Sequence, residues 1–111
     1  VGVWCSENGV GTIALAPLKG NPFSDNSDEF YQAMMTALNL ALASVLEFIR
    51  PFSTLSKREV VELGSNLPLE LTFSCIRPEN GLHCGRCNKC AERKASYRGL
   101  NLKDKTIYST N

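Results

Sequence analysis

SCIRPENGLHCGRCNKC spans residues 74–90 and holds four of the five cysteines of the chain. Cys84, Cys87 and Cys90 are each separated by two residues, and Cys75 precedes them across a short loop. A closed tetrahedral zinc site needs four donors at about 2.3 Å from the metal, and C-x-x-C spacing lets two thiolates on one tight turn reach the same ion. The spacing therefore predicts a structural zinc site whose ligands are Cys75, Cys84, Cys87 and Cys90.

Three other states of these cysteines remain as alternatives: disulfides, free buried thiols and a redox C-x-x-C pair. Overlapping C-x-x-C pairs cannot bridge one another without strain, and no export segment is visible in the sequence. A redox pair would leave Cys75 and one further sulfur without a role. Gly85 supports the zinc interpretation, because a glycine at this place permits the positive-φ turn that points successive sulfurs inward.

His83 is a rival ligand, since imidazole also binds zinc. Four cysteines already fill the coordination shell, so we expect His83 beside the metal site or on the surface. Four thiolates on one dication leave a net charge of about −2, which neighbouring cations must offset. The surrounding segment is basic, which fits charge compensation and leaves a nucleic-acid or phosphate surface as an alternative use of Arg77, Arg86, Lys89, Arg93, Lys94 and Arg98.

Composition sets broad limits. The chain has 111 residues, 43% hydrophobic residues and a formal net charge of +1, so it is one globular domain or a piece of one. It contains no run of eighteen apolar residues, which predicts no membrane partner, and its cysteine usage fits a reducing, cytoplasmic location. Because the first residue is Val1 and not Met, we expect a fragment or a processed product.

The hydrophobic pattern predicts alternating strands and helices. Apolar runs at 12–18 and 45–50 indicate strands, the second of which ends at Pro51. Helical spacing and capping residues indicate helices at 27–44, after Ser27, and at 57–63, after Ser56. This order predicts an α/β fold with a parallel sheet. The remaining expectations are the end of a helix at 1–8, an extended segment at 69–73, a helix at 91–98 and a polar tail with a short strand at 106–108. We also expect Cys5 to pack as a small apolar side chain.

Three segments together resemble one family. They are GNPFSDNSDEF at 20–30, RPFSTLSKREVVELG at 50–64, and LTFSC at 71–75 with CGRCNKCAER at 84–93. This series resembles the C-terminal half of the 7-cyano-7-deazaguanine synthases, the QueC or ExsB family, over residues 11–97. The cysteine motif alone occurs in many zinc proteins, whereas its combination with the other two segments is specific.

The resemblance implies a member of the PP-loop, or adenine-nucleotide α-hydrolase, superfamily with a Rossmann-like core. Such an enzyme is a cytoplasmic ATP-dependent carbon–nitrogen ligase of queuosine biosynthesis, which converts 7-carboxy-7-deazaguanine and ammonia to 7-cyano-7-deazaguanine (preQ0). It further implies zinc on the four cysteines and Asp25 near the deazaguanine base. An alternative role for Asp25 is to precap the following helix. Phe23 and Arg93 are the other candidate substrate contacts, although Arg93 is equally suited to compensating the thiolates.

The sequence also departs from the family. The ATP loop of the family, Ser-Gly-Gly-x-Asp-Ser, does not occur in it, so we expect the C-terminal portion of an enzyme whose N-terminal half is its partner and binds ATP. Alone, the fragment is expected to be inactive. Family members can dimerise, so a homodimer is a further candidate assembly. Asn21 and Phe23 differ from a Tyr-Pro-Asp form of this loop, which indicates a divergent subgroup. The expected parts are 1–74 (core), 75–98 (zinc loop and helix) and 99–111 (tail).

Two rival functions remain. In the first, a zinc knuckle binds nucleic acid through Arg77, Arg86, Lys89 and Arg98, although aromatic residues are not interleaved with them. In the second, the chain is part of a tRNA-thiolating PP-loop enzyme, for which iron in place of zinc would be diagnostic.

Overall fold

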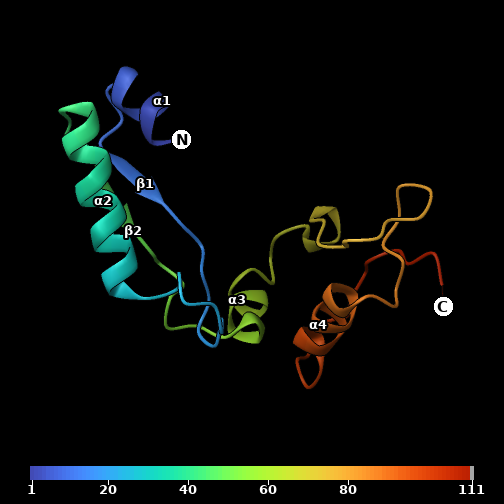
Figure 1. Cartoon of the computed structure of the whole chain (residues 1–111). Helices are drawn as coiled ribbons and strands as arrows, with labels where there is room; N and C mark the ends of the chain where they lie inside the picture. The colour runs from blue at the N-terminus through green and yellow to red at the C-terminus, as the bar shows by residue number, and fades with distance from the viewer. Residues whose placement is uncertain (111) are drawn as a thin grey trace. The chain divides into compact units, whose positions relative to one another are not determined.

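The computed structural model describes residues 1–110 and forms two compact units, Val1–Ser56 and Lys57–Asn111 (Figure 1). The first contains a parallel sheet with helices, and the second contains helices and a cysteine cluster. This arrangement confirms the predicted α/β class. None of the helices formed by residues 1–110 is both long enough and apolar enough to span a bilayer.

The first unit is built on two short parallel strands. Its elements are α1 (Gly2–Glu7), β1 (Thr12–Ala14), α2 (Asp28–Leu42) and β2 (Glu47–Ile49). In the register of the sheet, Ile13 is opposite Phe48. Side chains alternate between the two faces of a strand, so these two residues point to the same face, toward the core that α2 covers.

Local chemistry defines both ends of α2. The Ser27 hydroxyl accepts a hydrogen bond from the Phe30 N–H at 3.2 Å, which caps the first turn as predicted. Helix α2 ends where Ala43 adopts the left-handed conformation. The Asn39 side chain then fixes the return toward β2, since its amide donates to the Leu46 carbonyl at 3.0 Å and accepts from the Leu46 N–H at 2.7 Å.

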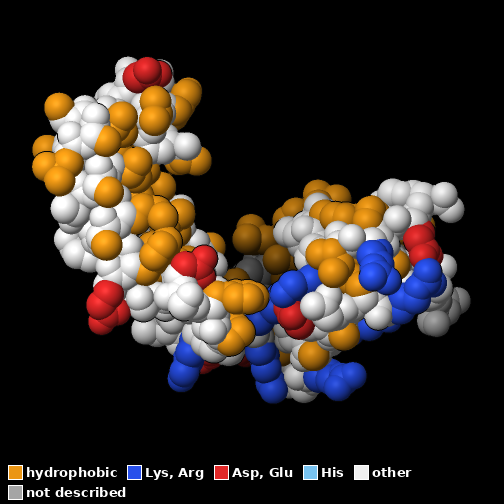
Figure 2. All heavy atoms as spheres, in the orientation of Figure 1, with side chains coloured by type: hydrophobic (Ala, Val, Ile, Leu, Met, Phe, Trp, Pro, Cys, Tyr) orange, Lys and Arg blue, Asp and Glu red, His pale blue; other side chains and the backbone are white. Residues whose placement is uncertain are grey.

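The core of the first unit is small and apolar. Cys5, Ile13 and Leu46 are buried, with Leu15, Leu38, Leu42 and Phe48 packed against them. Cys5 therefore packs as a small apolar residue, as predicted. Other hydrophobic side chains of this unit stay exposed, including Trp4, Leu40 and Val45. Figure 2 shows hydrophobic side chains on the surface of the molecule.

The second unit contains α3 (Lys57–Leu63), a 3-10 helix (Leu69–Leu71) and α4 (Asn88–Tyr97). The prediction of an extended segment at 69–73 was wrong, because residues 69–71 form this 3-10 helix directly after Pro68. Helix α4 begins three residues earlier than predicted, since the Cys87 sulfur caps it by accepting from the Cys90 N–H. Residues 101–110 form no helix or strand, and their pairing within the described chain is a single parallel bridge between His83 and Tyr108.

Candidate metal centre

The four predicted ligands meet in the second unit. The sulfur atoms of Cys75, Cys84, Cys87 and Cys90 all lie within 4.8 Å of one another. The Cys75 and Cys87 sulfurs are 3.8 Å apart, and those of Cys84 and Cys90 are 4.0 Å apart. All five cysteines of the chain are free thiols, so the sulfurs are grouped without disulfide bonds. Such a set of four soft donors is suited to a metal ion.

Backbone N–H groups point at three of the sulfurs. The Cys75 sulfur accepts from the N–H groups of Arg77 and Cys84, each at 3.3 Å. The Cys84 sulfur accepts from Cys87 N–H at 3.3 Å, and the Cys87 sulfur accepts from Cys90 N–H at 3.4 Å. Hydrogen bonds of this kind stabilise the charged form of their acceptor, so the backbone favours thiolates, the form that binds metals.

The surroundings of the cluster shift the pKa values of its thiols in opposite directions. A hydrogen bond from the Ile76 backbone lowers the pKa of Cys87 to about 6, and one from the Arg86 backbone lowers the pKa of Cys84. Burial raises the pKa of Cys90 to about 12. Four adjacent sulfurs cannot all carry negative charge without a counter-charge, and a bound dication would supply it. The donor set and its surroundings therefore fit a metal ion.

The cluster is also the buried core of its unit. Cys84 and Cys90 are 1% and 0% exposed, Cys75 is 9% exposed, and Cys87 and Tyr108 pack against them. A unit of this size gains little stability from a hydrophobic core alone, and small domains commonly use a structural metal instead. A metal ion here would contribute folding free energy directly.

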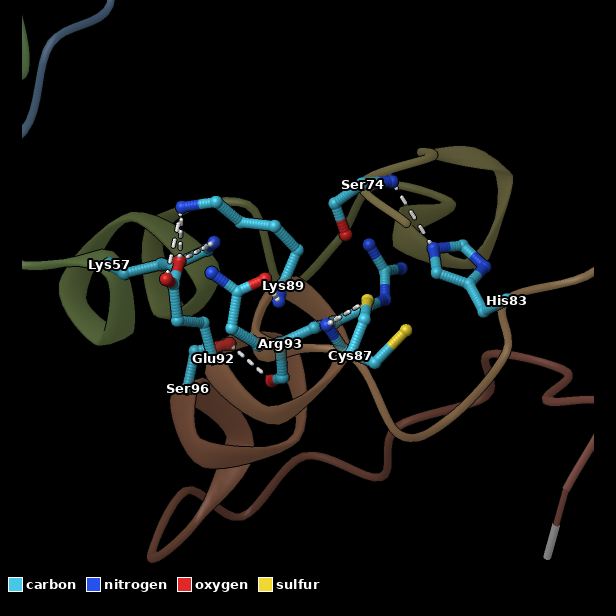
Figure 3. A network of polar contacts seen from close by, with 10 residues as sticks. Lys57, Ser74, His83, Cys87, Lys89, Glu92, Arg93 and Ser96 are labelled. Carbon is cyan, nitrogen blue, oxygen red and sulfur yellow. Dashed lines mark hydrogen bonds and ion pairs between the residues drawn. The ribbon is translucent and has the colours of Figure 1, made fainter. Parts of the chain in front are cut away.

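His83 lies beside the cluster and is not one of the grouped ligands. It is 4% exposed, and its Nε2 accepts a hydrogen bond from the Ser74 N–H at 3.2 Å (Figure 3). Its ring contacts Phe73 and Tyr108, with centroids 4.4 and 5.8 Å away. Burial, together with the charge of Arg93, lowers the pKa of His83. The neutral imidazole thus serves as a buried packing and hydrogen-bonding group next to Cys84.

Most of the basic segment has contacts inside the unit. Lys94 donates to the Gly85 carbonyl at 2.9 Å and lies over the Tyr108 ring. Arg86 pairs with Glu79, while Lys57 and Lys89 both contact Glu92 (Figure 3). These contacts leave less of the positive charge for nucleic acid than the sequence alone suggests.

Arg93 is buried, at 7% exposed. Its Nε donates to the Thr106 hydroxyl at 2.7 Å, its Nη1 to the Thr72 hydroxyl at 2.9 Å, and its Nη2 to the Leu69 carbonyl at 2.7 Å. The guanidinium therefore joins α4 to the 3-10 turn and to the tail. Its assignment as a substrate contact stays a prediction.

Asp25 and Phe23 lie in the first unit, in the loop between β1 and α2. Both are exposed, and Phe23 is 70% exposed. The loop is held by hydrogen bonds from the Phe23 N–H to the Asn21 side chain at 3.1 Å and from the Asn26 N–H to the Phe23 carbonyl at 3.0 Å. Its place after the carboxyl end of β1 is where parallel sheets bind ligands. Substrate contact by Asp25 and Phe23 stays a prediction.

The residues that sequence reasoning missed are those of the tail. Tyr108 packs on the cysteines, and the Thr110 hydroxyl donates to the Cys84 carbonyl at 2.6 Å. The only signal for them was the short strand expected at 106–108.

The fold and the site define an α/β protein with a buried cluster of four cysteines that could hold a metal ion. Residues 3–101 match the family described as "Queuosine biosynthesis protein QueC". A match over this much of the chain places it in that family, so the chain belongs to the QueC family.

Curated relatives agree with this assignment. Three proteins named 7-cyano-7-deazaguanine synthase are 35% identical over 88 residues (Methanothermobacter thermautotrophicus), 37% over 92 (Methanopyrus kandleri) and 40% over 100 (Leptospira interrogans). The alignments cover 78%, 78% and 84% of this chain and 39%, 40% and 41% of the relatives. The chain thus spans about two fifths of the length of the relatives it matches.

Proposed function

We propose that this chain forms the metal-stapled part of a 7-cyano-7-deazaguanine synthase, an ATP-dependent ligase that joins ammonia to 7-carboxy-7-deazaguanine and dehydrates the amide to the nitrile. The observation that carries the proposal is the QueC match over residues 3–101, which includes all four clustered cysteines. The ATP loop expected from the resemblance does not occur in this sequence, so we assign ATP binding to the part of the enzyme that this chain does not include, and that part is its proposed partner.

The proposed metal is zinc, and its role is structural. Four cysteine sulfurs would fill a tetrahedral shell and would leave no open position for water, so the ion would hold the loop at 75–87 against α4. Catalytic chemistry is then left to other residues of the enzyme.

Two of the proposed substrate contacts, Asp25 and Phe23, lie in the loop between β1 and α2. The Asp25 carboxylate can accept two hydrogen bonds from an amino-pyrimidinone edge, and the exposed Phe23 ring offers an apolar surface to a planar base. Ser27, and not Asp25, supplies the side-chain oxygen that caps α2. The cap therefore does not require the Asp25 carboxylate.

Activity is tested on the gene product that contains this chain. Incubated with 7-carboxy-7-deazaguanine, ammonia and ATP, it should form the nitrile, detected by mass spectrometry. Asp25→Asn should raise KM for the deazaguanine and leave KM for ATP unchanged. If no nitrile forms under conditions in which the Leptospira interrogans relative is active, the proposed reaction is wrong.

The metal is tested by elemental analysis of the purified chain. We expect one zinc per chain, and Cys87→Ser should lose it and unfold the second unit, whereas Cys5→Ser, outside the cluster, should keep it. Iron with visible absorbance would favour the thiolating alternative. A Cys87→Ser chain that stays folded with one zinc bound would contradict the structural role.

A further inference from the structure

Residues 104–110, which we call the strap, follow α4 and lie against the second unit without forming a helix or a strand. Their burial alternates, with Asp104, Thr106, Tyr108 and Thr110 half-buried and the residues between them exposed. An alternation of period two is what an extended segment shows when one of its sides rests on a surface. The strap is therefore packed, although it makes only one bridge of β type, between His83 and Tyr108.

Each inward residue of the strap makes its own contact. The Thr106 hydroxyl accepts from Arg93 Nε at 2.7 Å. The Tyr108 ring packs on the cysteines, and its hydroxyl donates to the Asp104 carboxylate at 2.6 Å. The Thr110 hydroxyl donates to the Cys84 carbonyl at 2.6 Å. The strap is thus joined to α4 at one end and to a cysteine of the cluster at the other.

The backbone adds a further contact next to the cluster. The Ser109 N–H donates to the His83 carbonyl at 2.8 Å, and the Ser109 hydroxyl donates to Glu79 at 2.7 Å. Gly85 leaves room for this approach, since a β-carbon there would lie 2.7 Å from the Thr110 hydroxyl oxygen and 2.9 Å from the Thr110 carbonyl oxygen. The turn between two cysteines and the end of the strap are therefore fitted to each other.

We propose that the strap is a closure for the metal centre, which must lift before the metal ion can leave or exchange. The inference rests on the metal binding proposed above and goes beyond it, because the family match ends at residue 101 and does not include the strap. Cys84 and Cys90 are almost fully buried while Tyr108 packs against the cluster, so a chelator can reach these sulfurs only after the cover moves.

The test is the rate of zinc release from the loaded chain to excess EDTA. Thr110→Val removes one hydrogen bond at nearly constant volume and should speed release about fivefold. Tyr108→Ala removes the cover and should speed release more than Thr110→Val does. Ile107→Ala is the matched control, because Ile107 belongs to the same segment and is 68% exposed. The rate at which this variant releases zinc should equal that of the unmodified chain.

A second measurement keeps the outcomes separate. Hydrogen exchange at the backbone amides of residues 83–90 should be faster in Thr110→Val than in Ile107→Ala. If Tyr108→Ala fails to fold, the comparison of Thr110→Val with Ile107→Ala decides. Folded variants that release zinc at the rate of the unmodified chain would overturn the closure. A chain that binds no zinc would overturn the proposed metal instead, and the exchange rates alone would then test the strap.

Discussion

Gly85 lies in the turn between Cys84 and Cys87 and also packs against Thr110 of the strap. Its φ is +75°, where a side chain costs about 1–2 kcal/mol, and a β-carbon would collide with Thr110. We predict that Gly85→Ala lowers the free energy of unfolding by about 3 kcal/mol, measured by denaturant titration of the zinc-loaded chain.

Gly81→Ala is the control for Gly85→Ala. Gly81 has φ +78° and no heavy atom within 4 Å of an added β-carbon, so this variant should show the backbone cost alone, about 1–2 kcal/mol. Equal losses of unfolding free energy in the two variants would mean that Thr110 of the strap does not pack closely against Gly85.

Arg93 tests a structural role against a substrate role. A lysine cannot reach the three acceptors that the planar guanidinium holds at Thr106, Thr72 and Leu69, so Arg93→Lys should lose about 2–4 kcal/mol of stability. Denaturant unfolding measures this loss. Thr106→Val should lose less, because it removes one of the three bonds. If Arg93→Lys keeps full stability and only weakens deazaguanine binding, the residue is a substrate contact as the sequence predicted.

Among the elements, the Asn39 side chain of α2 is hydrogen-bonded to the backbone just before β2. Both polar atoms of the Asn39 amide bond to the Leu46 backbone, and Leu46 is buried in the core of the first unit. Asn39→Ala should therefore destabilise this unit by about 2 kcal/mol, seen as faster exchange of its amides. Leu40→Ala is the matched control on the same helix, since Leu40 is 80% exposed. Equal effects of the two variants would contradict a clamp at Asn39.

Sequence predicted those elements whose signals are local. Ser27 and the apolar spacing identified α2. The C-x-x-C steps identified Cys84, Cys87 and Cys90, and Cys75 was added as the nearest remaining cysteine. Prediction from the sequence failed where contacts between residues distant in the sequence determine the local conformation. The turn at Leu69–Leu71 is held by the Arg93 guanidinium, and the strap is held by side chains from α4 and the metal loop, so neither pattern is visible in its own residues.

At the scale of the whole molecule, the two units have different kinds of core. The first buries Ile13 and Leu46 with Cys5, whereas the buried cluster of the second consists of cysteines. Hydrophobic burial therefore contributes to the stability of the first unit. If its four cysteines hold a metal ion as proposed, the second unit would be stabilised by metal–sulfur bonds, which exist only while the ion is bound.

Metal removal should therefore act on one unit and spare the other. After zinc is stripped with a chelator, we expect the amides of α4 to lose protection against hydrogen exchange, while those of α2 keep theirs within about twofold. Adding zinc back should restore α4, whereas magnesium should not, because it prefers oxygen ligands. Protection of α4 that survives chelation would mean that contacts such as those of Arg93 hold the unit together and that the ion is dispensable for its fold.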